Sequence, residues 1–97
     1  MFGSKAVRII RIDGYRIEAP PEGNFLMLHN RDVPGVVGAV GTMLGQAGVN
    51  IAGLELDRDR AGGMALSLVQ VDAPVPPAVV EQLKTIPAIT AAATIRL

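Results

Sequence analysis

Cysteine is absent from this 97-residue chain, tryptophan is absent too, and histidine occurs once. Without thiols the chain has no disulfide framework, zinc ribbon or cysteine nucleophile, and a single histidine has no second histidine or cysteine with which to build a metal site. No spacing of serine, histidine and aspartate suggests a catalytic triad. We therefore expect no metal and no catalytic residues, and the composition fits the reducing cytoplasm.

Charge is scarce and balanced, with nine Lys and Arg against nine Asp and Glu and a formal net charge of zero. A neutral chain has no long-range field to draw it to nucleic acid or to an anionic membrane, and we expect neither partner. Neutrality also weakens self-repulsion, which permits a homodimer or higher homo-oligomer. Hydrophobic residues make up 49% of the chain, enough for one domain, whereas a catalytic domain with a separate cofactor domain needs a longer chain.

One uncharged run, from Val33 to Leu54, has the length of a membrane-spanning segment. Its apolar residues recur on one face only, and Gly48 followed by β-branched residues indicates a change from helix to strand. A helix limited to Pro34–Ala47 would be about 21 Å long at about 1.5 Å per residue, short of a hydrocarbon core of about 30 Å. We therefore do not expect a membrane span, and no signal peptide is predicted before Arg8.

The first 23 residues form a unit of their own. Apolar residues flank Asp13-Gly14, a dipeptide that favours a tight turn, and predict a two-stranded hairpin over Ala6–Ala19. Two prolines and Gly23 then interrupt strand pairing, so we divide the chain into residues 1–23 and 24–97. An isolated hairpin is marginally stable in water, so this one is expected to belong to a neighbouring domain or to dock on one, as the tail of a domain that begins upstream.

Residues 24–97 contain six predicted elements in the order βαββαβ. Apolar residues recur with a period of two in the strands and near 3.6 in the helices. The elements are strand Asn24–Asn30, helix Pro34–Ala47, strands Val49–Arg58 and Met64–Val71, helix Pro76–Ile86 and strand Ile89–Leu97. Two βαβ crossovers split by a hairpin predict an α+β, ferredoxin-like sandwich, with an antiparallel four-stranded sheet, both helices on one face and the other face open.

Two finer features follow from the strand patterns. The apolar phase slips between Ile51 and Leu54, which predicts a bulge near Gly53. The last strand alternates between apolar and polar positions, which predicts one buried face made of Ile89, Ala91, Ala93, Ile95 and Leu97.

The turn from the first strand to the first helix is the most informative segment. A helix start leaves about four amide N–H groups without intrahelical partners, which suits an anion. Gly35 permits close approach to this backbone, while Asn30 and Asp32 offer polar side chains to a cationic or hydroxyl group. Together they match the carboxylate and ammonium of an amino acid. The alternative is that Asn30 and Asp32 only cap the helix, and the turn alone favours that interpretation.

Other residues leave further alternatives open. One stripe of the first helix has no side chains, because it consists of Gly38, Gly41 and Gly45. Each glycine lowers helix stability by on the order of 1 kcal/mol relative to alanine. This cost suggests the close approach of a ligand, a partner subunit or the second helix, and plain packing is the alternative. The spacing of these glycines departs from G-x-G-x-x-G, so no dinucleotide site is expected. Asn50 either shapes the entry to its strand or donates to a carboxylate across an interface. The charged residues 58–60 are interpreted as a solvated hairpin tip.

Three stretches resemble the ACT domain, a small regulatory module that binds amino acids. They are Asn30–Gly38 (NRDVPGVVG), Val40–Gly45 (VGTMLG) and Gly48–Ala52 (GVNIA), and the resemblance extends over roughly Asn24–Leu97. The preceding Val7–Tyr15 resembles the end of the intervening domain found before the ACT domain in many bacterial D-3-phosphoglycerate dehydrogenases. The combination is more specific than either piece.

This resemblance implies allosteric regulation of L-serine biosynthesis. In that family ACT domains pair side by side into a continuous sheet, and L-serine binds at the interface as a feedback inhibitor. The implied effector contacts are Asn30 and Asp32, the amides near Gly35 and Val36, and Asn50 of the partner subunit. Some relatives place histidine and asparagine where this sequence has Asn30 and Asp32, and an aspartate repels a ligand carboxylate but pairs with an ammonium.

The resemblance also implies that the catalytic parts lie upstream of these residues. NAD and phosphoglycerate sites of such an oxidoreductase cannot be placed on this chain, which is expected to hold no cofactor and not to be an enzyme alone. Two alternatives stay open. One is a structural dimerisation domain without a ligand, and the other is the ACT domain of an iron–sulfur L-serine deaminase subunit, where a similar arrangement recurs.

Overall fold

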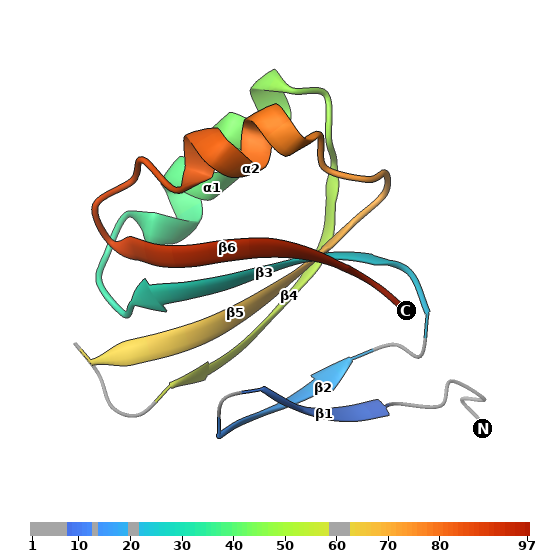
Figure 1. Cartoon of the computed structure of the whole chain (residues 1–97), viewed down its shortest axis with the longest axis vertical. Helices are drawn as coiled ribbons and strands as arrows, with labels where there is room; N and C mark the ends of the chain where they lie inside the picture. The colour runs from blue at the N-terminus through green and yellow to red at the C-terminus, as the bar shows by residue number, and fades with distance from the viewer. Residues whose placement is uncertain (1–7, 13, 20–21, 59–62) are drawn as a thin grey trace.

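The computed structural model describes residues 8–12, 14–19, 22–58 and 63–97, which form a hairpin and a helix-covered sheet (Figure 1). The hairpin consists of β1 (Arg8–Ile12) and β2 (Tyr15–Ala19). The elements that follow are β3 (Asn24–Arg31), α1 (Val36–Gln46), β4 (Ile51–Arg58), β5 (Met64–Val71), α2 (Pro77–Leu83) and β6 (Ile89–Arg96). The predicted βαββαβ order is confirmed, and both helices are shorter than predicted.

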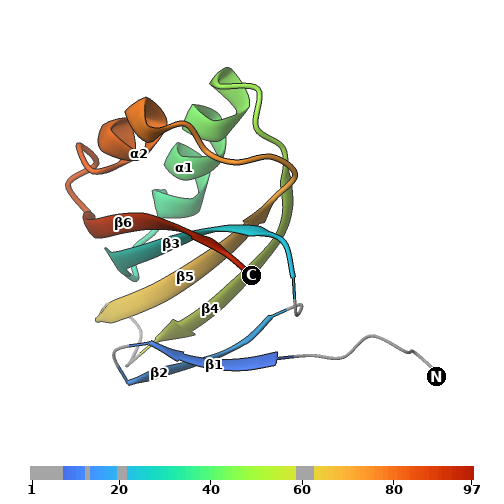
Figure 2. The same ribbon diagram turned by 45° about the vertical axis from the view of Figure 1, so that its right-hand side comes forward.

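The four-stranded sheet is antiparallel, with the strand order β4-β5-β3-β6. Both helices cover the same face (Figures 1 and 2). Leu44 of α1 and Leu83 of α2 are fully buried there against Leu26 and Leu28 of β3. In the described part of the chain neither helix has the length and hydropathy needed to cross a membrane.

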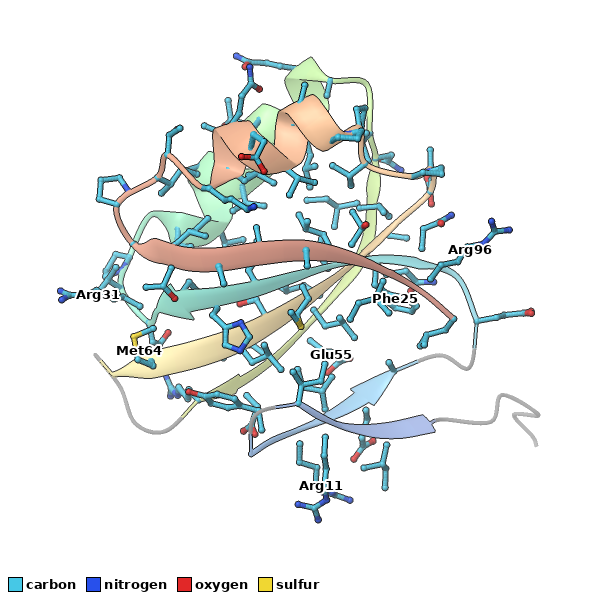
Figure 3. The ribbon with its side chains drawn as sticks, in the orientation of Figure 1. Arg11, Phe25, Arg31, Glu55, Met64 and Arg96 are labelled. Carbon is cyan, nitrogen blue, oxygen red and sulfur yellow. The ribbon has the colours of Figure 1, made fainter. Side chains whose placement is uncertain are left out.

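The hairpin covers the second face of the sheet, which was predicted to be open (Figure 2). Ile17 and Ala19 of β2 are buried against Phe25, Leu66 and Leu68. These residues form a second hydrophobic core, of which Phe25 is labelled in Figure 3. The prediction of an open face was wrong because the residues before Gly23 supply a cover that a ferredoxin-like sandwich lacks. The hairpin therefore docks on the sheet of its own chain.

A hydrogen bond fixes the hairpin against the edge strand of the sheet. The Arg16 backbone N–H of β2 donates to Asp57 Oδ2 of β4 at 2.8 Å. In the register of the hairpin Arg16 lies opposite Arg11, and the Asp57 carboxylate supplies the acceptor that a third strand would otherwise offer to this N–H. The contact leaves β1 as the outer strand of the hairpin.

The strand irregularities agree with the sequence patterns in β4 and differ from them in β6. The register of β4 against β5 shifts between Ile51 and Gly53, which confirms the predicted bulge. A second shift occurs where β6 begins, between His29 and Asn30 of β3. Ile89 lies in the helix-side core, whereas Ile95 packs on the hairpin side. The single buried face predicted for the last strand was wrong, because β6 changes phase and the sheet is covered on both faces.

Candidate functional site

Helix α1 begins without a side-chain cap. Gly35 is its N-cap, with φ of 92° in the left-handed region that favours glycine, and no side chain bonds to the first amides. The interpretation of Asn30 and Asp32 as helix caps was therefore wrong. The N–H groups at the start of the helix, including that of Val36, have no intrahelical acceptor, as at any helix start. The turn between β3 and α1 thus keeps its capacity for an anion.

Asn30 is a buried residue that holds this turn in place. The residue is 3% exposed, because Asn30 lies on the helix-facing side of β3. The amide Nδ2 donates to the Arg31 carbonyl at 2.8 Å, and Oδ1 accepts from the Ser67 hydroxyl of β5 at 2.9 Å. A buried amide needs such partners. The sequence analysis did not predict a role for Ser67. A serine within the apolar run of β5 nevertheless indicates a polar partner in the core.

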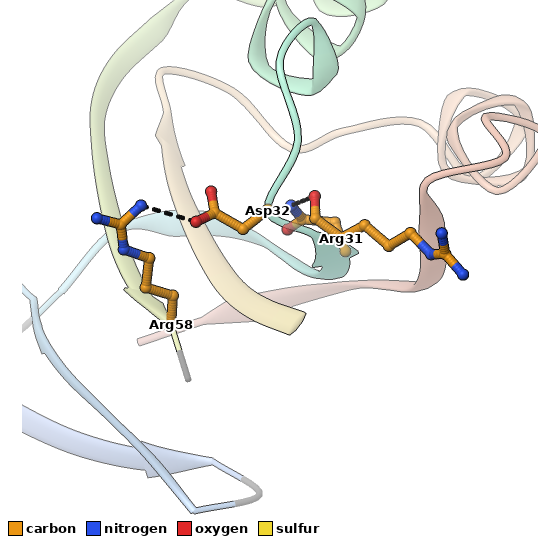
Figure 4. A network of polar contacts seen from close by, with 4 residues as sticks. Arg31, Asp32 and Arg58 are labelled. Carbon is orange, nitrogen blue, oxygen red and sulfur yellow. Dashed lines mark hydrogen bonds and ion pairs between the residues drawn. The ribbon is translucent and has the colours of Figure 1, made fainter. Parts of the chain in front are cut away.

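Asp32 pairs with an arginine at the end of the edge strand β4 (Figure 4). Arg58 Nη1, at the end of β4, donates to Asp32 Oδ2 at 2.8 Å, and the side chains are 53% and 21% exposed respectively. The Asp32 backbone N–H donates to the Gly63 carbonyl at 2.8 Å. Arg58 is exposed, as predicted for a solvated tip at residues 58–60, but its ion pair with Asp32 was not predicted. Residues 59 and 60 lie outside the described residues.

Asn50 lies at the opposite end of α1. Its Nδ2 donates to Asp72 Oδ2 at 2.8 Å, and the Asp72 N–H returns a bond to the Asn50 carbonyl at 3.0 Å. The 11 residues of α1 separate Gly35 from this pair by about 16 Å, at about 1.5 Å per residue. One chain therefore brings Asn30, Asp32, Gly35 and Val36 together and leaves Asn50 apart.

An exposed apolar patch follows α1 and the edge strand β4. Its members, on α1, on β4 and in the turn before α1, are large hydrophobic residues that stay exposed: Val33, Val37, Ile51, Leu54 and Leu56. A cavity of about 50 Å³ opens within it, and Val37, Ile51 and Leu54 contribute to its walls. Ser67 adds a polar residue to its lining. We refer to the five exposed residues as the edge patch.

The glycine stripe of α1 also faces outward. A Cβ added at Gly38 or Gly45 would meet no atom within 4 Å, and one at Gly41 would meet only Ile51 Cδ1, at 3.9 Å. Close packing against α2 is therefore not the reason for these glycines. The stripe borders the edge patch, where a ligand or a partner subunit has room to approach.

Comparison with known proteins assigns residues 24–88 to a family model described as "ACT domain". D-3-phosphoglycerate dehydrogenase of Archaeoglobus fulgidus is 38% identical over 99% of this chain. The proteins of the same name from Methanocaldococcus jannaschii and Bacillus subtilis are 38% and 32% identical over 92% and 93% of it. The match covers 18%, 17% and 17% of these three relatives, so the chain spans less than a fifth of their length.

A solved structure supports the fold. The C-terminal domain of the MgtC protein from Mycobacterium tuberculosis superimposes with a TM-score of 0.55, over 91% of this chain and 94% of that domain. The two sequences are 12% identical, so the similarity is one of fold alone.

Proposed function

The chain belongs to the ACT domain family, and we propose that it is the amino-acid-binding regulatory module of a D-3-phosphoglycerate dehydrogenase, inhibited by L-serine. The observation that carries the proposal is the match to proteins of that name over nearly the whole chain, hairpin included. The catalytic domains and the NAD site would belong to the rest of such a protein, in the cytoplasm. This chain would contribute the effector site.

The proposed effector site combines the turn before α1 with a second copy of the chain. The first amides of α1, with Gly35 open above them, would receive the effector carboxylate. Asp32 would receive the ammonium. Asn30 would keep its hydrogen bonds to Ser67 and Arg31 and hold the turn, without contacting the effector.

The edge strand β4 supports pairing of two copies. β4 is an edge strand of the sheet and carries three members of the edge patch, exposed apolar surface that a second copy would bury. Antiparallel pairing of β4 with its copy about a two-fold axis brings the start of one strand beside the end of the other. Asn50 of the partner subunit would then approach Asp32 and Arg58, and its bond to Asp72 would be exchanged for one to the effector.

Calorimetric titration of the 97-residue chain with L-serine tests the proposal, with D-serine and glycine as controls and sedimentation to establish the oligomeric state. We expect saturable, stereoselective heat from a dimer. Leu54→Lys should abolish both dimer and heat, because it places a charge in the edge patch. Ile9→Lys is the matched control, since Ile9 is 52% exposed on the hairpin. Leu54→Lys protein that remains dimeric would contradict the proposed interface.

A ligand-free dimerisation domain is the second candidate function. It is favoured by the bonds that Asn30 and Asn50 make within the chain, because neither amide needs an effector. A dimer that releases no heat with any of the three amino acids would select this function. Nothing in the described residues favours an iron–sulfur deaminase subunit, and the upstream reading frame would distinguish that parent.

A further inference from the structure

We infer that Asp32 and Arg58 form a charge clamp for a zwitterionic α-amino acid, in which Arg58 joins the first amides of α1 in binding the carboxylate and Asp32 binds the ammonium. This inference rests on the proposed function and deepens it. It adds Arg58, which lies 26 residues away in the chain, to the effector contacts. It also restricts the effector to molecules that carry both charges on neighbouring groups.

The ion pair leaves bonding capacity on both side chains. A guanidinium carries five N–H donors and a carboxylate accepts about four hydrogen bonds, and the pair itself uses one of each. The Arg58 side chain is about half exposed and Asp32 about a fifth, so solvent reaches both. The donor and acceptor lie 2.8 Å apart. In an α-amino acid the carboxylate and the ammonium are attached to the same carbon. The carboxylate can therefore reach Arg58 while the ammonium reaches Asp32.

The charges explain which ligands the clamp accepts. Asp32 alone would repel a carboxylate that approaches the start of α1. Arg58 cancels that charge, so the clamp is neutral overall and the positive end of the helix dipole remains. A neutral zwitterion then gains a favourable partner for each of its charges. A simple amine or a simple carboxylic acid gains only one partner.

The backbone holds the clamp in position before a ligand arrives. The Asp32 N–H donates to the Gly63 carbonyl and the Arg31 N–H to the Ala88 carbonyl, at 2.8 Å each. These bonds fix the turn to the residue before β5 and to the residue before β6. Arg58 ends β4, which is paired with β5 up to this residue. Pre-ordered groups bind with a smaller entropy loss. The edge patch adjoins the clamp through Val33 and Leu56, and its burial by a second copy would strengthen the charge contacts by excluding water.

The alternative is that the Asp32–Arg58 ion pair has a structural role alone. Such a pair would only position the turn, and exposed pairs contribute little to stability, so Arg58→Gln protein should remain folded under either interpretation. The two interpretations differ in whether the effect of Arg58 depends on the carboxylate of the ligand. Arg31 provides a matched control, because it is an adjacent exposed arginine whose side chain extends away from Asp32 (Figure 4).

The test is a calorimetric titration of wild type, Arg58→Gln and Arg31→Gln chains with L-serine and with L-serinamide, which lacks the carboxylate. Arg58→Gln should weaken L-serine binding about tenfold or more, the effect of losing one charge-assisted hydrogen bond. It should leave L-serinamide binding equal or tighter, because Asp32 is then uncompensated. Arg31→Gln should change neither ligand by more than about twofold, as expected for a surface substitution.

Each other outcome overturns the inference. Unchanged L-serine binding in Arg58→Gln would remove Arg58 from the site and leave the proposed function intact. Equal weakening of both ligands would show that Arg58 only positions the turn. L-serinamide that fails to bind the Arg58→Gln protein at millimolar concentration would show that Asp32 is not the ammonium partner. A wild-type chain that binds no amino acid would overturn both the clamp and the proposed function.

Discussion

The docking of the hairpin on the sheet predicts a large loss of stability for Ile17→Ala. Ile17 is 3% exposed and lies between β2 and the sheet, in contact with the core that contains Phe25, Leu66 and Leu68. The substitution removes three carbon atoms, worth about 2.4 kcal/mol at about 0.8 kcal/mol each. The cavity left behind adds to this loss, so we expect about 2–5 kcal/mol. That is a large part of the about 5–15 kcal/mol that stabilises a typical domain.

Thermal and denaturant unfolding followed by circular dichroism measure this loss. A domain of this size loses about 4–8 °C per kcal/mol, so a loss of about 2–5 kcal/mol should lower the midpoint of thermal unfolding by about 8–40 °C. Protein concentration must be held constant because self-association would shift the midpoint. The denaturant slope should stay unchanged if the hairpin and the sheet unfold together.

Ile9→Ala is the control for this experiment. Ile9 belongs to the same hairpin, is 52% exposed and should change stability by less than about 0.5 kcal/mol when truncated. A similar small loss for both variants would refute the docking of the hairpin. Two separate transitions in the wild-type chain would also refute it, because hairpin and sheet would then be independent units.

Two further substitutions test the site and its surroundings. Ser67→Ala should lower the free energy of unfolding, measured with denaturant, by about 1–3 kcal/mol, because it leaves the buried Asn30 Oδ1 without its donor. Thr85→Ala, the control, removes an exposed hydroxyl and should lower it by less. An equal cost for both would contradict the buried network. Gly38→Ala should stabilise the monomer by up to about 1 kcal/mol, because its Cβ has open space, and sedimentation should show weaker self-association if a partner approaches the stripe. Destabilisation of the monomer by Gly38→Ala would contradict the open geometry.

The order of the elements was predictable because each one carries a local period. The apolar spacing of α1 and the phase slip in β4 are both present within a few residues of sequence, and the structure confirms both. The start of α1 was misplaced because Gly35, and not a polar side chain, forms the N-cap. A left-handed glycine at that position follows from the path of the turn, which the pattern of apolar residues does not specify.

The cover on the second face was not predicted, although part of its signal was present. β3 and β5 carry continuous apolar runs, such as Ala65–Val69 with Ser67 as the one interruption, and such runs are typical of strands buried on both faces. The alternation in the last strand suggested one open face and obscured this signal. The identity of the covering segment depends on a contact distant in sequence, between Ile17 and Leu66 or Leu68.

The candidate site was predicted in part, for a related reason. Asp32 and Gly35 follow from their place before a helix, whereas the pairing of Asp32 with Arg58 spans 26 residues. It depends on how β4 and β5 bring the end of one strand beside the turn. Asn50 cannot join these residues within one chain, and its assignment to the site stays a prediction that requires a second copy.

The bulge at Gly53 determines which charged residue of β4 reaches the turn. Consecutive strand residues face opposite sides of a sheet, and a shift of one residue exchanges the two faces. With the extra residue between Ile51 and Gly53, Arg58 lies on the side of Asp32 and Asp57 lies on the side of Arg16. Without it the two would exchange sides, and a carboxylate would confront Asp32 while a guanidinium confronted the Arg16 N–H. The same irregularity therefore determines both the contact at the candidate site and the contact with the hairpin.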